Sequence, residues 1–200
     1  MQVTKELAHV MRDENLFIHE VHPTDVPGQF ISELTIDGKP PYLYENLAIA
    51  NHVSGTTIME ASRQMLKAMS HLFYDVPVQY RFTMRKLHMD FSRWAKLSVP
   101  VQMVLDAQTR ASTVRGKPCL TFHGQMTYYQ EGRMIGIMTG VFTAFDREVE
   151  DFLMNRQFAQ PPLTKAPTGS HPLAIETPID LGRAPAPEMK SKSQSKLTSP

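Results

Sequence analysis

The sequence predicts an α+β domain in which one antiparallel β-sheet wraps around a single long helix. Two strand-like runs come first, one long amphipathic helix follows, and four more strand-like runs come after it without another strong helix between them. Since strands alone must bury the apolar side of this helix, the order favours a twisted sheet that curls around it. Such a sheet leaves one edge and the polar side of the helix uncovered, and a second copy of the chain could cover both.

The two early strands are predicted from alternation and from their boundaries. They correspond to residues 16–23, LFIHEVHP, and residues 28–37, GQFISELTID. Prolines separate the two runs, and the turn pair Asp37-Gly38 ends the second.

The long helix is predicted from Ser54 to Phe73. Ser54 suits an N-cap, and Pro77 follows the helix end. Apolar residues recur at the spacing of a buried helix face, namely Ile58, Ala61, Met65, Met69 and Leu72.

The remaining strands are predicted as a meander. The links STVRG and EGR are short enough for hairpins, and the phase of alternation slips near Arg85-Lys86, which predicts a bulge there. A last helix, REVEDFLMNRQF, is predicted to close the domain. The four strand-like runs cover residues 78–91, 97–110, 117–130 and 133–146.

Composition sets the domain organisation. A chain of 200 residues that is 42% hydrophobic suits one domain with something attached. After Phe158 the chain has no aromatic residue and holds eight of the fifteen prolines. We therefore predict a domain over residues 1–158 and a flexible Pro/Ser/Lys-rich tail over residues 159–200, because such a segment cannot bury a core.

Charge and cysteine usage exclude several classes of function. Twenty-one basic and 20 acidic residues leave a net charge of +1, without the basic surplus of a nucleic-acid binder. No apolar run approaches the ~18 residues of a membrane span, and charges interrupt the N-terminus where a signal peptide would be apolar. The single Cys119 cannot form an intrachain disulfide, and no metal, nucleotide or flavin motif occurs. We expect a cytoplasmic protein without cofactor, metal, membrane or nucleic-acid partner.

The helix also carries a row of polar residues opposite its apolar stripe. Glu60, Arg63, Gln64, Lys67 and His71 lie three or four positions apart. On spacing alone, this row is typical of a solvated surface with i, i+4 neighbours. The alternative is that the row lines a site.

Three stretches in order resemble the A-factor biosynthesis (AfsA) hotdog family. They are VHPTDVPGQFISEL, then NHVSGTTIMEASRQ with its ExxRQ signature, and then FYDVPVQYRFTMRKLHMDF. The resemblance implies a hotdog fold. Members that make butyrolactone signals generally carry two repeats, whereas this chain has one, which implies a homodimer. Asp75 and Gly55-Thr56 depart from the family pattern, so the resemblance does not fix the substrate.

The resemblance implies an acyl-thioester site at the start of the helix, facing the partner subunit. There Glu60 is expected to be the general acid or base, with its pKa raised by burial, and Gln64 to orient the carboxylate or the substrate. The N–H groups around Gly55 and Thr56 are expected to hold the thioester oxygen. His52 would exchange a proton at the same carbonyl, and Arg63 would bind an anionic co-substrate or pair with Glu60.

The reaction that the resemblance implies most directly is acyl transfer. A β-ketoacyl group would pass from acyl carrier protein or coenzyme A to a small hydroxy compound, in a secondary-metabolite or signalling-lactone pathway. The alternatives are a dehydratase or isomerase acting on a β-hydroxyacyl thioester, a thioesterase, and a non-catalytic domain that binds an acyl chain or a lactone. The same fold hosts many chemistries, so the site must decide.

Other candidate residues are interpreted as structural. His22 ends a strand, His88 and His123 lie in strand patterns, and Cys119 has no adjacent histidine to activate it. We expect no catalytic role for these four residues.

Overall fold

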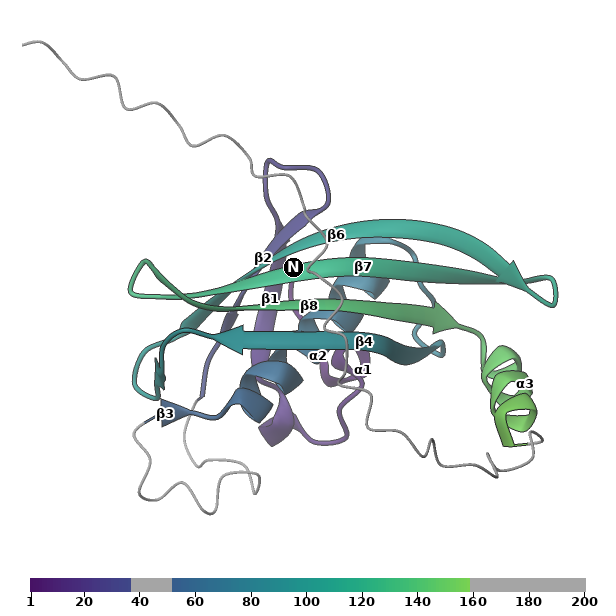
Figure 1. The fold of residues 1–200 in the computed structure, drawn as a ribbon, viewed down its shortest axis with the longest axis horizontal. Coiled ribbons are helices and arrows are strands. Elements are labelled where there is room, and N and C mark those ends of the chain that lie inside the picture. Colours follow the sequence, from purple (N-terminus) through teal and green to yellow (C-terminus); the bar gives the residue numbers. More distant parts are fainter. Residues whose placement is uncertain (37–51, 159–200) are drawn as a thin grey trace, which may run out of the picture. The chain divides into compact units, whose positions relative to one another are not determined.

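The computed structural model describes residues 1–36 and 52–158, and its centre is a six-stranded antiparallel sheet in the order β1-β2-β6-β7-β8-β4. The long helix α2 lies against this sheet (Figure 1). The strands are β1 (Ile18–Pro23), β2 (Gln29–Leu34), β3 (His52–Val53), β4 (Arg81–Phe91), β5 (Ala95–Lys96), β6 (Val101–Val114), β7 (Lys117–Gln130) and β8 (Arg133–Phe145). The helices are α1 (Lys5–Ala8), the 3₁₀ helix η1 (Asp13–Asn15), α2 (Gly55–Phe73) and α3 (Arg147–Phe158). The predicted α+β arrangement is confirmed.

Two tight hairpins connect the three longest strands. Arg115 and Gly116 join β6 to β7, and Glu131 and Gly132 join β7 to β8. All four residues have φ between 52° and 76°, the left-handed region that a two-residue turn of the favoured twist requires. The two predicted hairpins, and the meander of β6, β7 and β8, are therefore confirmed. The first of the four predicted runs departs from the meander: β4 pairs with β8 instead of β6, because residues 92–100 between β4 and β6 form a longer connection that contains β5.

Strand β4 lies at one edge of the sheet and pairs with β8. Its register with β8 shifts between Met84 and Lys86. This is the position at which the phase of alternation slips in the sequence, so the predicted bulge is confirmed.

Helix α2 is buried on more than its apolar stripe. The side chain of Ser54 accepts the Thr57 N–H at the helix start, which confirms the predicted N-cap. Four of the five predicted stripe residues are buried, and Leu72 is partly buried. Polar residues of the helix are buried too, namely Thr57, Ser62, Gln64 and Ser70.

The cover over the polar side of α2 comes from the N-terminus. Residues 4–17, here called the N-terminal loop, carry α1 and η1, and α1 packs against α2. Both ends of the loop are tied to the sheet. Val3 N–H donates to His19 O at 2.8 Å on one side, and Thr35 N–H donates to Phe17 O at 3.2 Å on the other. The sequence patterns predicted no element before residue 16, and the predicted strand 16–23 begins two residues later than expected, at Ile18.

The last helix, α3, forms at the residues predicted for it. Its Val149 packs with Cys119 and Phe145 in a small second apolar cluster. Within the described part of the chain, no helix is long and apolar enough to cross a membrane. The predicted tail and the predicted Asp37-Gly38 turn both lie outside the described residues.

Candidate active site

Glu60, Arg63 and Gln64 form one hydrogen-bonded cluster on α2. Arg63 approaches the carboxylate with two groups, Nε donating to Oε2 at 2.6 Å and Nη2 donating to Oε1. Gln64 Nε2 donates to Oε1 at 3.1 Å. Residues three and four apart share one side of a helix, so the ExxRQ spacing itself makes these contacts possible.

Gln64 is the fully buried member of this cluster, and main-chain groups hold its amide in place. Its Oε1 accepts the main-chain N–H of Phe17 at 2.9 Å, and its Nε2 donates to the main-chain oxygen of Asn15 at 2.7 Å. The side chain therefore joins α2 to the N-terminal loop. A solvated polar face, which the spacing alone favoured, is wrong for Gln64 and for Glu60, whose side chain is only 25% exposed.

The charge state of Glu60 differs from the expectation. Burial acts to raise the pKa of this carboxyl, but hydrogen bonds from Arg63 and Gln64 and the positive charges of Arg63 and Lys67 outweigh it, so the pKa lies below its ordinary value of 4.5. The expected raised pKa is wrong because Arg63, for which pairing here was one of two alternatives, donates two hydrogen bonds to the carboxylate. Glu60 is thus ionised at neutral pH.

At the start of α2, main-chain N–H groups are exposed and available to bind a ligand. Gly55 and Thr56 are exposed, and within the described residues their N–H groups have no hydrogen-bond acceptor. The first N–H groups of a helix point outward and carry the positive end of the helix dipole. A developing negative charge on an oxygen would be stabilised there.

His52 lies just before the helix, on β3. Its ring meets Trp94 edge to face, with ring centroids 4.5 Å apart, and Trp94 is 77% exposed. No hydrogen bond among the described residues links His52 to Glu60. The predicted residues therefore fall into two groups along α2: one at the helix start and one around Glu60, about 7 Å further along the axis at 1.5 Å per residue.

A second cluster, which was not predicted from the sequence, joins α2 to the N-terminal loop and β4. His9 Nε2 and His71 Nε2 lie 2.9 Å apart, and Lys67 Nζ lies 5.6 Å from the centre of the Phe82 ring. Burial, together with the charges of Arg63 and Arg81, lowers the pKa of Lys67 to about 8, against the opposing effect of Glu60. His71 and Lys67 were recognised as helix residues, but no local pattern in the sequence pointed to His9.

The four residues interpreted as structural show no feature of a site. His22 is exposed and contacts Glu20 at 2.9 Å, and His88 and His123 are exposed on strands. Cys119 is buried, and that burial raises the pKa of its thiol. Among the described residues, no group of three or more His, Cys, Asp or Glu is placed to hold a metal ion.

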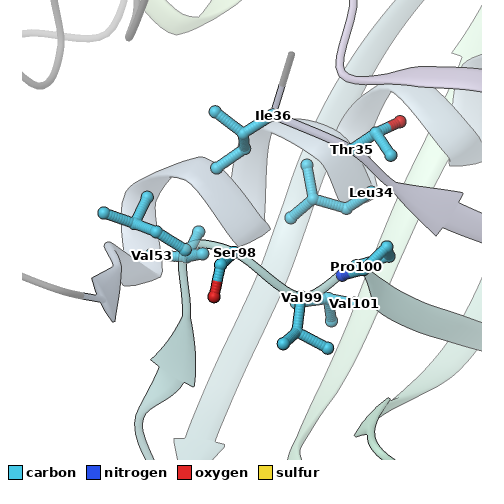
Figure 2. A pocket seen from close by; sticks show the side chains of 9 residues that line it. Leu34, Thr35, Ile36, Val53, Ser98, Val99, Pro100 and Val101 are labelled. Atoms are coloured by element: carbon cyan, nitrogen blue, oxygen red, sulfur yellow. The ribbon is translucent and has the colours of Figure 1, made fainter. Parts of the chain in front are cut away.

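An apolar hollow of about 150 Å³ lies beside β3, and none of the six predicted site residues lines it. Figure 2 shows residues that line it, among them Leu34, Val53 and Val99, and its two polar lining residues are Thr35 and Ser98. It is therefore separate from the Glu60 cluster, and we assign it no part in the chemistry.

The chain resembles several solved structures at low identity. A mutant of the phenylacetic acid degradation protein PaaI from Thermus thermophilus is 16% identical, with 66% of this chain and 96% of that chain covered and a TM-score of 0.41. The PaaI protein of E. coli is 8% identical, with 63% and 81% covered and a TM-score of 0.44. AziG of S. sahachiroi is 9% identical, with 64% and 90% covered and a TM-score of 0.43.

The family match is more informative than these weak similarities. No curated protein sequence matches the chain. The A-factor biosynthesis hotdog domain, by contrast, matches residues 1–146, which is almost the whole of the described region. That stretch includes the helix with its ExxRQ signature and the full antiparallel sheet. The chain therefore belongs to the A-factor biosynthesis hotdog family.

Proposed function

We propose that the protein transfers a β-ketoacyl group from an acyl carrier protein or coenzyme A thioester to a small hydroxy acceptor, in a secondary-metabolite or signalling-lactone pathway. Membership of the family supports chemistry on an acyl thioester. The observation that carries the proposal is the state of Glu60: a carboxylate that Arg63 and Gln64 keep ionised is ready to accept the proton of a hydroxyl group in the first step.

In the proposed reaction, Glu60 takes the proton of the acceptor hydroxyl while the hydroxyl oxygen attacks the thioester carbonyl carbon. The N–H groups of Gly55 and Thr56 stabilise the negative carbonyl oxygen of the tetrahedral intermediate. The C–S bond then breaks, the carbonyl re-forms, and the leaving thiolate takes the proton that Glu60 has accepted, either directly or through His52, which passes one proton on as it receives one. The products are the ester of the acceptor and the free thiol.

Arg63 keeps one group available for the acceptor. Its Nε and Nη2 serve Glu60, while its Nη1 has no partner within the described residues. A phosphate or carboxylate on the acceptor could bind this group, which would place the acceptor beside the base.

Two enzymatic alternatives use the same residues differently. A dehydratase would use Glu60 to remove a proton from the β-hydroxyacyl substrate and then to protonate the leaving hydroxyl, so its products, and not the charge of Glu60, distinguish it from the transferase. A thioesterase would use water in place of the acceptor. A domain that only binds an acyl chain or a lactone would turn over none of these substrates.

The test is to incubate the protein with β-ketoacyl and β-hydroxyacyl thioesters, with and without dihydroxyacetone phosphate, and to identify products by mass spectrometry. Loss of the β-ketoacyl thioester that depends on the acceptor supports the transferase. Release of the free acid without the acceptor identifies a thioesterase, and loss of water identifies a dehydratase. An intact thioester in every mixture contradicts all three enzymes.

Removing Arg63 should move the acid limb of the activity to higher pH. A base works only when deprotonated, so the protonation of Glu60 by itself should lower kcat/KM only below the ordinary carboxyl value of about pH 4.5. Without the guanidinium, the effect of burial on the pKa of Glu60 is no longer offset by Arg63, and Arg63→Gln should shift the limb to higher pH. Steady-state rates from acid to neutral pH measure this. Arg110→Gln, at an exposed position on β6, is the control and should leave the limb unchanged.

We also propose that the protein is a homodimer joined through β4. This strand pairs on one side only within the described residues, and it exposes Met84 and Leu87, each 39% accessible. Light scattering should give twice the mass of the chain. The double variant Met84→Lys, Leu87→Lys should be a monomer, whereas Met134→Lys on β8 should remain a dimer. A wild-type protein that is monomeric at micromolar concentration would contradict the dimer.

A further inference from the structure

The N-terminal loop is fastened to α2 by a pair of histidines. The rings of His9 and His71 stack with centroids 5.0 Å apart and planes 13° from parallel, and their Nε2 atoms are 2.9 Å apart. Phe82 of β4 meets both rings edge to face, at 5.5 Å and 5.4 Å. A contact this close between two imidazole nitrogens requires one N–H and one bare nitrogen.

The neighbouring backbone decides which ring is the donor. His71 Nδ1 lies 2.7 Å from the Val76 main-chain oxygen, which can only accept, so His71 carries its proton on Nδ1. Neutral His71 is then bare at Nε2 and accepts the Nε2–H of His9. Protonation of His71 would set two N–H groups against each other, and protonation of His9 would add a charge to a positive neighbourhood.

The groups around the pair are mostly cationic. Lys67 and Arg63 face His9 from α2, and Arg81 faces it from β4. Burial, followed by the charges of Lys67, His71, Arg63 and Arg81, lowers the pKa of His9 to about 4. Burial lowers the pKa of His71 as well, against the opposing hydrogen bond to Val76 and together with the charge of Lys67.

We infer that the N-terminal loop is a positioning element of the Glu60 site, and that the neutral His9–His71 pair is a latch that releases the loop when the pH falls. The loop supplies the Asn15 oxygen, and its end supplies the Phe17 N–H, the two main-chain groups that hold the Gln64 amide. Gln64 in turn holds Glu60. The consequence for catalysis rests on the function proposed above, whereas the latch itself does not.

The sign and size of the effect follow from the difference in protonation. A released His9 regains its ordinary pKa of 6.5, so the open loop binds a proton more readily than the closed loop. The preference for the closed loop is therefore at its full value above about pH 6.5 and weakens as the pH falls toward 4. At about pH 5, one such histidine shifts the equilibrium about 30-fold toward the open loop.

Hydrogen exchange in the loop tests the latch without any substrate, so its outcome is independent of the proposed reaction. The variant is His9→Gln, which keeps a donor near the position of Nε2, does not titrate, and can turn its amide oxygen toward a protonated His71. At about pH 5, amides of residues 4–17 should exchange about 30-fold faster in the wild type than in His9→Gln. At about pH 8 the two proteins should exchange alike, and peptides from β7 should stay protected in both.

Two further variants complete the test. His71→Asn keeps a donor for Val76 but removes the acceptor of His9, so its loop should exchange fast even at about pH 8. His123→Gln, at an exposed position on β7, should behave as the wild type. Equal exchange of the wild type and His9→Gln at about pH 5, or wild-type protection in His71→Asn, would overturn the latch.

The effect on activity distinguishes a positioning role from a merely structural one. If the proposed turnover is found, His9→Gln should extend the acid limb of kcat to lower pH while leaving KM at neutral pH unchanged. A limb that does not move would show that the loop opens without disturbing Glu60, and would overturn the positioning role.

Discussion

Glu60→Gln is expected to lower acceptor-dependent turnover by about 10²–10⁴-fold, the contribution of a well-placed general base. The amide keeps the size of the side chain and can still accept from Arg63, but it cannot take the hydroxyl proton. Since the loss falls on the chemical step, kcat should drop while KM changes little. Initial rates of ester formation from the β-ketoacyl thioester provide the measurement.

The control is Glu33→Gln, which removes a carboxylate from an exposed position on β2. It should retain wild-type rates. Thermal unfolding of Glu60→Gln should fall only modestly below that of the wild type, because the amide keeps one of the two oxygens that accept from Arg63 and this contact is only partly buried. If the variant turns over the thioester at an undiminished rate, Glu60 is not the base.

The elements of the fold could be predicted because their signals are local. The stripe through Ile58, Met65 and Met69 defines the buried helix face, and the two-residue links at Gly116 and Gly132 define the β6-β7-β8 meander. The place of β4 beside β8 had no such local signal. The bulge near Lys86 could also be predicted, because the alternation of apolar and polar residues changes phase within a single strand.

The environment of the site could not be predicted in the same way. Spacing placed Arg63 and Gln64 within reach of Glu60, but it did not show that the arginine would bind the carboxylate or that the N-terminal loop would bury the amide. Both the Arg63 contact and the hydrogen bond from the buried Gln64 amide affect the pKa of Glu60 and therefore its charge. His9 meets His71 across 62 positions of sequence, and contacts of that kind have no periodic signal.

Among the contacts between α2 and the N-terminal loop, those of Gln64 should contribute most to the free energy of unfolding. Gln64→Met keeps the length of the side chain and its helix propensity but leaves the Phe17 N–H and the Asn15 oxygen without their partner. A main-chain group stripped of its bond inside a protein costs about 1–3 kcal/mol, so two of them, one in a less buried contact, should cost about 2–4 kcal/mol. Urea unfolding should show a lower midpoint with an unchanged slope.

Gln108→Met separates this effect from the loss of any glutamine, since Gln108 is exposed on β6. It should change the free energy of unfolding by no more than about 0.5 kcal/mol. A cost below about 1 kcal/mol for Gln64→Met would mean that water replaces the lost amide, and hence that the N-terminal loop is not closed over α2 in solution. The predicted larger cost instead ties the stability of the domain to the residue that holds the proposed base.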